Sequence, residues 1–373
     1  MSGIYIHIPF CKQACHYCNF HFSTSLKLMD DMVDAIVIEM ALRKNYLSDE
    51  SIQTIYFGGG TPSLLEAVHF KKIFDKIHEL YMVADQAEVT LEANPDDLSM
   101  EKIQILKEYG INRLSVGIQS FFDNDLQWMN RSHNSLQAHQ VLEHAGKAGI
   151  DNISIDLIFG GLHATEASWK KNLEIAVEYK IPHISCYGLT IEERTALAHQ
   201  LKTGKTSVAS EEKQSLFYQM ANDYLSEAGY LHYEISNYSL PGKLSVHNTS
   251  YWQQKPYIGL GPSAHSFNGT TRQWNLANNP KYIESLSDNK VPFTIEELTS
   301  TDIYNEYLMT GLRTIWGCDW VKLEALNIDA ARQLKLELAD HVHKGLITSD
   351  TDSIRLTAQG QLIADSIIAS FFI

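Results

Sequence analysis

The first 190 residues alternate short apolar segments with longer amphipathic ones, and this alternation restricts the fold more than any other feature. We expect strands at 4–8, 54–57, 88–93, 113–118, 153–159 and 183–189, and helices at 26–43, 69–81, 100–109, 135–148 and 166–179. Strands that alternate with helices of this length form βαβ units and a mostly parallel sheet. The sequence therefore predicts an α/β fold, as an open sheet or a partial barrel. In both, ligands lie at the C-terminal ends of the strands.

The second half has a different pattern. A helix is expected at 211–228, and a stretch rich in Gly, Asn and aromatic residues follows to about residue 279. From residue 300 the pattern is mostly helical, with a hairpin expected at 345–349 and 353–356 and a helix from 358. This order resembles a winged helix. We predict a core at 1–229, a connecting segment at 230–289 and a small helical domain at 290–373.

Composition excludes several classes of protein. The chain has 30 Lys and Arg against 45 Asp and Glu, a net charge of −15, which argues against a nucleic-acid partner. Five Cys are too few for a disulfide-stapled scaffold. The N-terminus lacks the pattern of an export signal and no apolar run is long enough to span a membrane, so we expect a cytoplasmic, reducing location.

Three of the five cysteines are clustered directly after the first predicted strand. Cys11, Cys15 and Cys18 form C-x3-C-x2-C. They suit a [4Fe–4S] cluster that has three protein thiolates and one open iron. A structural zinc site completed by His16 or His21 is the alternative. Cys186 and Cys318 are isolated, and we expect them to be packed side chains.

Glycines and polar residues follow the next strands. Gly58-Gly59-Gly60-Thr61 ends the second strand, and glycines allow a close approach of backbone to a ligand or form a tight turn. Polar residues near the later strand ends are Glu92, Gln119, Arg131 and Asp156. Each alone fits a surface or capping role, whereas together they predict a site at the C-terminal edge of the sheet.

The motif YIHIPFC-x3-C-x2-C followed by GGGTPS resembles the radical SAM enzymes, and among them the oxygen-independent coproporphyrinogen III dehydrogenase-like family. The resemblance implies a partial (βα)6 barrel with a small, mostly helical, winged-helix-like C-terminal domain. It implies that Cys11, Cys15 and Cys18 hold a [4Fe–4S] cluster whose open iron binds S-adenosylmethionine. In that family, electron transfer from the cluster cleaves S-adenosylmethionine to a 5′-deoxyadenosyl radical.

The resemblance also implies contacts with S-adenosylmethionine. Gly59, Gly60 and Thr61 would hold its methionine part, and Glu92 and Arg131 its amino-acid end. Gln119 and Asp156 would contact the ribose or a second cofactor molecule. Tyr5 and Tyr17 would lie near the cluster and the adenine, with packing in the core as the alternative for Tyr5.

Two departures distinguish branches of this family. The dehydrogenase branch has a fourth Cys two residues after the third, where this chain has Phe20, and a long arm before the cluster, where this chain has ten residues. Both departures match the haem-chaperone (HemW-type) branch, as does the H-N-x-x-Y-W motif at 247–252. The resemblance implies haem binding with His247 as a candidate ligand. A hydrogen-bonded loop His with core aromatics is the alternative, and His265 is a weaker candidate.

The leading hypothesis is a haem chaperone. Its expected partners are haem, an apo-haem protein acceptor, which can be membrane-associated, and an electron donor, with no nucleic acid. Enzymatic activity stays open at this point. Oxidative decarboxylation of coproporphyrinogen III is the alternative function, although Phe20 and the short N-terminus argue against it. A structural zinc protein is a third hypothesis.

Overall fold

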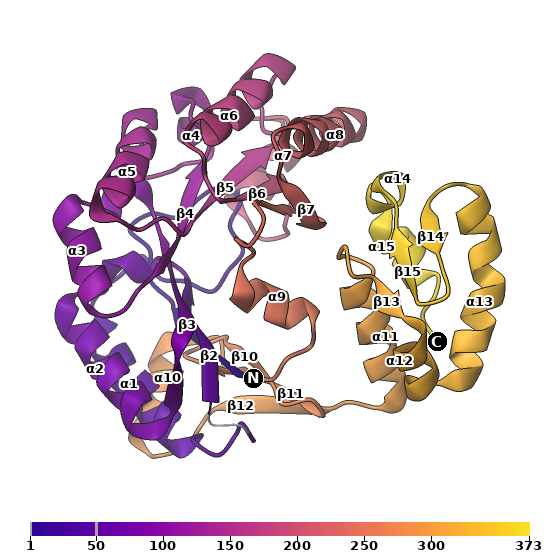
Figure 1. The fold of residues 1–373 in the computed structure, drawn as a ribbon. Helices are drawn as coiled ribbons and strands as arrows, with labels where there is room; N and C mark the ends of the chain where they lie inside the picture. Colours follow the sequence, from indigo (N-terminus) through magenta and orange to yellow (C-terminus); the bar gives the residue numbers. More distant parts are fainter. Residues whose placement is uncertain (1, 49–50) are drawn as a thin grey trace.

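In the computed structural model, which describes residues 2–48 and 51–373, the main body is one sheet of twelve strands (Figure 1). The strand order is β12-β11-β10-β9-β1-β2-β3-β4-β5-β6-β8-β7, and neighbours are parallel from β9 through β6. The parallel strands are β1 (Ser2–Ile8), β2 (Ser51–Gly59), β3 (Met82–Ala93), β4 (Arg113–Gln119), β5 (Ile153–Phe159), β6 (His183–Gly188) and β9 (Tyr257–Leu260). The predicted α/β class and partial barrel are confirmed.

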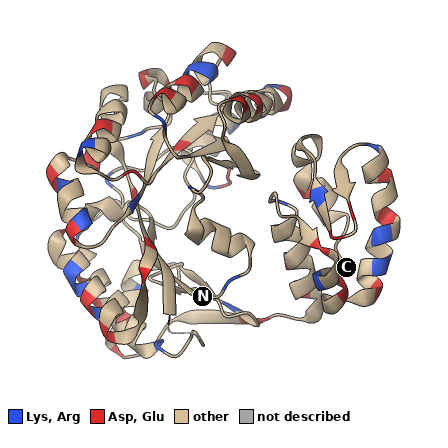
Figure 2. Cartoon of the chain, viewed as in Figure 1, with Lys and Arg blue, Asp and Glu red and all other residues tan. Residues whose placement is uncertain are grey.

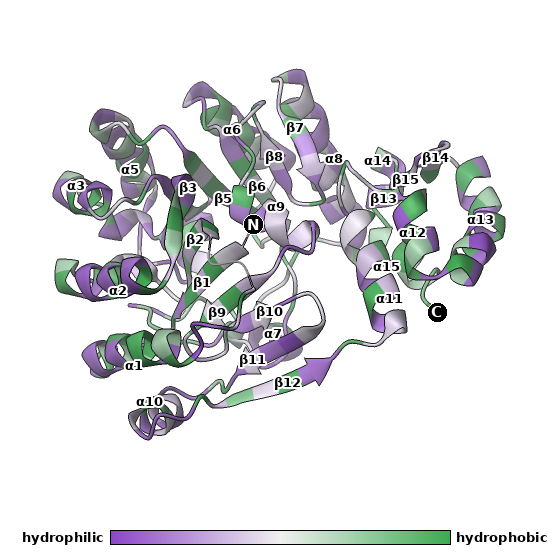
Figure 3. Cartoon of the chain, turned by 60° about the horizontal axis from the view of Figure 1, so that its bottom comes forward, coloured by the Kyte–Doolittle hydropathy of each residue, from purple (hydrophilic) through white to green (hydrophobic). Residues whose placement is uncertain are grey.

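Helices cover the outer face of the sheet (Figure 1). They are α1 (Met29–Leu42), α2 (Ala67–Leu80), α3 (Met100–Glu108), α4 (Asp123–Trp128), α5 (Ser135–Ala148), α6 (Glu166–Glu178), α7 (Ala196–Lys202), α8 (Glu211–Glu227) and α10 (Asn279–Ser287). Figure 2 shows that many charged residues lie on these helices, and Figure 3 shows the apolar strands inside. Clear caps set the limits of α5, since Asn134 begins it with a capping box and Gly149 ends it at a φ of 71°.

The predicted connecting segment at 230–289 contributes strands to the same sheet. Its strands are β7 (Leu231–Glu234), β8 (Asn237–Ser239), β9, β10 (His265–Phe267) and β11 (Thr271–Asn275). β9 pairs in parallel with β1, and β12 (Phe293–Glu297) extends that edge beyond β11. The boundaries at 229 and 289 stay a prediction. β3 begins at Met82 rather than at the predicted residue 88, because Met82 and Val83 already pair with the start of β2, ahead of the polar residues Asp85 and Gln86.

A buried charge network joins this edge of the sheet to α1. The Arg43 guanidinium donates to Glu39 (2.8 Å), to the Gly259 carbonyl (2.8 Å) and to Ser266 (2.9 Å). Glu39 also accepts from Asn275 at 2.8 Å, and its side chain is fully buried. Because every strand from β9 to β11 has a residue in this network, α1 holds them in place.

The C-terminal region has its own buried apolar cluster, from Tyr304 to Phe371. Its elements are α11 (Ser300–Gly311), β13 (Cys318–Asp319), α12 (Trp320–Leu326), α13 (Ile328–His343), β14 (Ile347–Ser349), β15 (Ser353–Leu356), α14 (Ala358–Gln361) and α15 (Ala364–Ala369). The predicted hairpin, β14–β15, and the helix after it are confirmed. Cys186 and Cys318 are buried thiols, as expected. Within the described residues, no helix is long and apolar enough to cross a bilayer.

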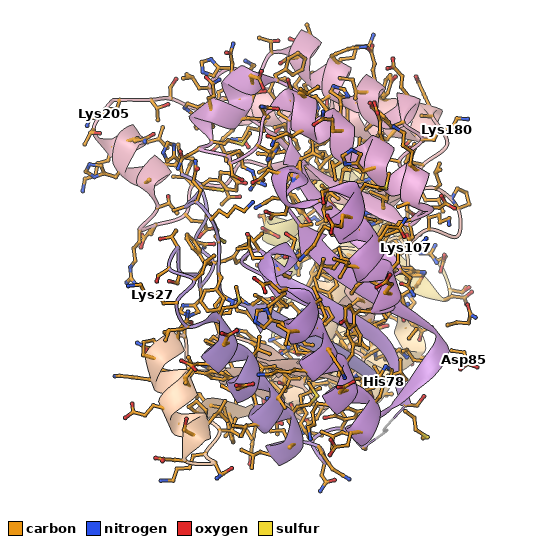
Figure 4. All side chains as sticks on the ribbon, turned by 90° about the vertical axis from the view of Figure 1, so that its left-hand side faces the viewer. Lys27, His78, Asp85, Lys107, Lys180 and Lys205 are labelled. Carbon is orange, nitrogen blue, oxygen red and sulfur yellow. The ribbon has the colours of Figure 1, made fainter. Side chains whose placement is uncertain are left out.

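The two edges of the barrel are distinct in Figure 4. Lys27, which follows the cysteine loop, and Lys205, which follows α7, lie at one edge. Lys107 and Lys180, at the ends of α3 and α6, lie at the opposite edge. The edge with Lys27 is where the parallel strands end, so this edge contains the candidate site.

Candidate functional site

The three clustered cysteines lie on the loop that follows β1, at this C-terminal edge. Two backbone hydrogen bonds close the base of the loop, from Cys11 to the Ser23 carbonyl (3.0 Å) and from Ser23 to the Pro9 carbonyl (2.9 Å). Lys12 pairs with Asp96 in the loop after β3, at 3.0 Å. The loop is therefore fixed at its base and along one flank.

The thiols of Cys11, Cys15 and Cys18 are free and half-buried. Burial raises the pKa of Cys11 to about 11, a hydrogen bond with Thr61 opposes this rise, and repulsion from Cys18 and Cys15 adds to it. The thiolate of Cys11 is therefore favoured only beside a cationic partner. No three His, Cys, Asp or Glu side chains within residues 2–48 and 51–373 converge as ligands of one metal ion. In a [4Fe–4S] cluster, by contrast, each thiolate binds a different iron.

Arg131 reaches the cysteine loop from the turn after α4. Its Nη1 lies 3.4 Å from the Cys15 sulfur and 3.4 Å from the Tyr17 hydroxyl. Its Nη2 donates to the Asn94 side chain (2.6 Å) and to the Gly117 carbonyl (2.9 Å). The Nε atom is buried and has no hydrogen-bond partner among the described residues. The guanidinium thus has a donor available for an anionic ligand beside the thiols.

Two partly buried carboxyl groups lie on β3 and β5, on either side of β4. Glu92 accepts from the Tyr56 hydroxyl (2.8 Å) and from the Gly59 N–H (3.1 Å). Burial raises the pKa of Glu92 to about 7, and the charge of Asp156 adds to the rise. Burial also raises the pKa of Asp156 to about 6, against a hydrogen bond from Ser185. Both carboxyl groups would therefore gain from a ligand that donates hydrogen bonds.

Gln119, at the end of β4, has a strained backbone and an unpaired side-chain oxygen. Its φ of 64° is in the left-handed region, which is uncommon for a residue with a Cβ. Its Oε1 is buried and lacks a hydrogen-bond partner among the described residues. Strain and an orphaned acceptor together are typical of a ligand contact.

The glycine turn after β2 packs tightly against the start of the cysteine loop. A Cβ on Gly59, whose φ is 106°, would lie 2.5 Å from the His7 ring, and one on Gly60 would lie 2.5 Å from the Phe10 carbonyl oxygen. The Thr61 N–H donates to that carbonyl at 2.7 Å. Only glycine therefore fits at positions 59 and 60, because any side chain there would collide with the residues that begin the cysteine loop. Direct contact of Gly59, Gly60 and Thr61 with a ligand stays a prediction.

The two predicted tyrosines have different surroundings. Tyr17 lies beside Arg131, next to the thiols. Tyr5 hydrogen-bonds His7 at 3.1 Å and stacks on Tyr56 at a ring distance of 6.1 Å, so it is part of an aromatic layer below the glycine turn. The sequence analysis missed Asn94 and Tyr56, which orient Arg131 and Glu92. Asn94 carried a usable signal, because it follows Glu92 at the same strand end.

Comparison with known proteins identifies the family. The radical SAM superfamily matches residues 5–190, and the HemN C-terminal domain matches residues 298–363. Heme chaperone HemW of Bacillus subtilis is 33% identical over 375 residues, covering 100% of this chain and 99% of the relative. HemW of Synechocystis is 36% identical over 336 residues, covering 87% of this chain and 81% of the relative. The chain belongs to the haem-chaperone (HemW-type) branch of the radical SAM family.

The fold of this HemW-type chain is that of a solved relative. Coproporphyrinogen III oxidase (HemN) from Escherichia coli superposes with a TM-score of 0.85 at 22% identity, covering 100% of this chain and 90% of that one. The predicted fold class is thereby confirmed. In the cysteine loop of this HemW-type chain, the side chain of Phe20, where the resemblance implies a Cys in the dehydrogenase branch, is 69% exposed.

The HemW-type motif at 247–252 forms a short helix, α9 (Val246–Trp252), on the inner side of the sheet (Figure 1). The Glu88 carboxylate of β3 accepts from the backbone N–H groups of Val246 (3.0 Å) and His247 (2.9 Å) at the helix start. Anions are favoured at this end of a helix. α9 is therefore anchored by its first residues.

His247 points into the sheet and is 1% exposed. Its Nδ1 lies 2.8 Å from the Thr54 hydroxyl, and its Nε2 lies 2.8 Å from the Tyr251 hydroxyl. Burial lowers the pKa of His247 to about 3. Both nitrogens are thus in use, so that iron binding would require breaking one of these bonds. His247 as haem ligand stays a prediction. His265 is exposed and stacks on Trp274.

A cavity of about 1050 Å³ lies on the other side of α9, between β6, α9 and α11. Tyr251 and Trp252 of the motif line it, together with Tyr187 of β6 and Met309 and Arg313 of the C-terminal region. Its volume is at the upper end of the range usual for small-molecule sites. The HemW-type motif therefore has a buried end at His247 and an end that faces this cavity.

Proposed function

We propose that the protein is a haem chaperone that binds haem and passes it to an apo-haem protein, on a core that holds a [4Fe–4S] cluster and S-adenosylmethionine. The observation that carries the proposal is the similarity along the whole chain to proteins named heme chaperones. Phe20 supports it, since the resemblance gives the dehydrogenase branch a Cys at this position.

The residues at the strand ends fit these two cofactors. Cys11, Cys15 and Cys18 would hold the cluster, which when bound supplies an open iron and a one-electron reductant. The unpaired Nε of Arg131 and Oε1 of Gln119 are the orphaned polar atoms that a polar ligand beside the thiols would satisfy. This fit supports S-adenosylmethionine because that molecule carries a carboxylate, an amino group and ribose hydroxyls.

Each predicted contact has a distinct role in this proposal. Arg131 binds the carboxylate and Glu92 the amino group, because their charges are opposite to those of the ligand. Asp156 and Gln119 accept hydrogen bonds from ribose hydroxyls or from a second cofactor molecule. The remaining contacts are Tyr5, Tyr17, Gly59, Gly60 and Thr61. The partners are haem, an apo-haem protein and an electron donor, in a cytoplasmic location.

Hemin titration of the purified protein tests haem binding. We expect a saturable shift of the Soret band, and the absence of such a shift would contradict the proposal. Transfer is tested by mixing haem-loaded protein with an apo-haem protein, whose spectrum should convert faster than spontaneous hemin release allows. Incubating the reconstituted protein anaerobically with coproporphyrinogen III, S-adenosylmethionine and reductant tests the competing function. Formation of protoporphyrinogen would overturn the assignment.

A further inference from the structure

The cavity behind α9 has walls suited to a flat aromatic ligand. Trp252 and Tyr251 form one wall at the end of α9, and Tyr187 lies on the β6 side. Met309 of α11 lines the C-terminal side. Aromatic walls of this kind pack on an extended π-system. Phenol and thioether groups are also ligand types found on haem iron, and none of the described lining residues is a His.

Cations gather at the same cavity although the chain is acidic. Lys255, in the turn after α9, lines the cavity and forms no ion pair within the described residues. Burial lowers the pKa of Lys322 on α12. The charge of Cys318 opposes this decrease, and the positive charge of Lys255 increases it. Lys322 does not itself line the cavity, so Lys255 is the lysine of this pair that an anionic ligand in the cavity would meet.

A second cation of the lining is Arg313, after α11. Its Nη2 donates to Asp365 at 2.5 Å, but Asp365 is 86% exposed, so the pair is weak and can be exchanged for another partner. The other two carboxyl groups of the lining, Glu306 and Glu234, contribute little free negative charge to the cavity. Glu306 pairs with Arg272 through two hydrogen bonds of 2.6 and 2.7 Å. Burial raises the pKa of Glu234 to about 7, which reduces its negative charge near neutral pH.

Backbone hydrogen bonds fix the far wall of the cavity to the sheet. The Ile235 N–H donates to the Arg313 carbonyl (3.1 Å), and the Ile315 N–H donates to the Tyr233 carbonyl (3.0 Å). The cavity is thus built jointly by the barrel and the C-terminal region. A ligand in it would contact both.

We propose that haem binds in this cavity, with the macrocycle packed on Trp252 and the propionates directed to Lys255 and Arg313. This inference rests on the proposed function as a haem chaperone. It assigns the two ends of the motif different tasks. Trp252 contacts haem, whereas His247, in place of the ligand role predicted from the resemblance, is a positioning residue that holds α9 on β2 and does not bind the iron.

Hemin titration of matched variants tests the site. Trp252→Ala should weaken hemin binding about tenfold or more, because it removes the main apolar wall. Lys255→Glu should also weaken binding about tenfold, since it places a carboxylate opposite the propionates. Trp316→Ala and Lys205→Glu are the controls, because neither residue belongs to the described lining. Lys205 is also exposed at the strand-end edge (Figure 4). Both controls should bind hemin as the wild-type protein does.

A second ligand isolates the role of the charge. Haem dimethyl ester lacks the carboxylates, so Lys255→Glu and the wild-type protein should bind it equally. His247→Gln should keep the Soret position of the wild-type complex. Circular dichroism and thermal unfolding establish that each variant is folded.

The outcomes separate the site from the function. If the wild-type protein binds hemin but Trp252→Ala and Lys255→Glu bind it equally well, the cavity is the wrong site, although the chaperone proposal stands. If folded His247→Gln loses the wild-type Soret band, His247 binds the iron and the inference is overturned. If the wild-type protein binds no hemin, the proposed function itself fails.

Discussion

The Nδ1 atom of His247 lies 2.8 Å from the Oγ1 atom of Thr54, a buried hydrogen bond that fixes α9 to β2. The same ring stacks on Tyr56 at a centroid distance of 4.9 Å, and the Tyr56 hydroxyl donates to Glu92. One aromatic layer therefore connects the motif helix to the carboxyl group at the strand ends. The position of α9 and that of Glu92 depend on the same side chains.

His247→Leu should lower the free energy of unfolding by about 2–3 kcal/mol, because Thr54 and Tyr251 lose a buried partner. Urea unfolding measures this change. His265→Leu is the control, since His265 is exposed, and it should change stability by no more than about 0.5 kcal/mol. Equal stability of the His247→Leu and wild-type proteins would show that these bonds contribute little.

Glu234→Gln should flatten the pH dependence of stability. The pKa of Glu234 rises on folding from 4.5 to about 7, so the folded state retains a proton that the unfolded chain has released. The contribution of this pKa shift to the free energy of unfolding is full below pH 4.5. It is lost as the pH rises to about 7, a change of roughly 3 kcal/mol. Unfolding measured across this range should fall more steeply for the wild-type protein than for the variant. Parallel curves would contradict the raised pKa.

Cys15→Ala should abolish the iron–sulfur cluster, because two thiolates do not hold it. The measurement is iron and sulfide content after anaerobic reconstitution. Cys318→Ala is the matched control, since Cys318 is a buried thiol in the C-terminal region, and it should retain full iron and sulfide. Full cluster content in Cys15→Ala would reject the ligand assignment.

Arg131→Lys should weaken binding of S-adenosylmethionine by about tenfold to a hundredfold, because a lysine keeps the charge but loses the fork that binds a carboxylate. Calorimetry on reconstituted protein measures the affinity, and iron content checks that the cluster is intact. Arg332→Ala, at an exposed position on α13, should bind normally. An unchanged affinity in Arg131→Lys would remove Arg131 from the proposed site.

Arg43→Ala should destabilise the protein by about 3–5 kcal/mol, because it leaves the Glu39 carboxylate buried without its cation. Lys71→Ala is the control, as Lys71 and Asp75 form a pair of the same i, i+4 spacing on the exposed face of α2. That variant should change stability by no more than about 0.5 kcal/mol. Similar effects of the two variants would contradict the role of burial.

The elements predicted best are those whose signals are local. α5 and β5 have the predicted bounds, because Asn134 and Gly149 delimit the helix and the strand is a continuous apolar run. β9 to β11 were missed as strands, since they are only three to five residues long. Their pairing also depends on a partner far away in the sequence, β1, which local periodicity does not reveal.

Part of the candidate site was also predictable, because the ends of the predicted strands are local signals. Strand ends in a parallel sheet converge, so the polar residues that follow them were expected to meet, and Arg131 does lie within 3.4 Å of Cys15. The direction of a side chain on α9 was not predictable. Whether His247 faces the sheet or the cavity depends on Thr54 and Glu88, which lie more than 150 residues earlier in the chain. The buried Glu234 gave no sequence signal.

The parallel pairing of β9 with β1 has a consequence for the order of events during synthesis. Gly3 to Ile6 pair with Tyr257 to Leu260, so one edge of β1 stays open until the ribosome has added some 250 further residues. At ordinary elongation rates this takes roughly ten to fifty seconds. Throughout that interval the strand that carries the cysteine loop has only β2 beside it. Metal loading of the nascent chain would therefore meet an unfinished sheet.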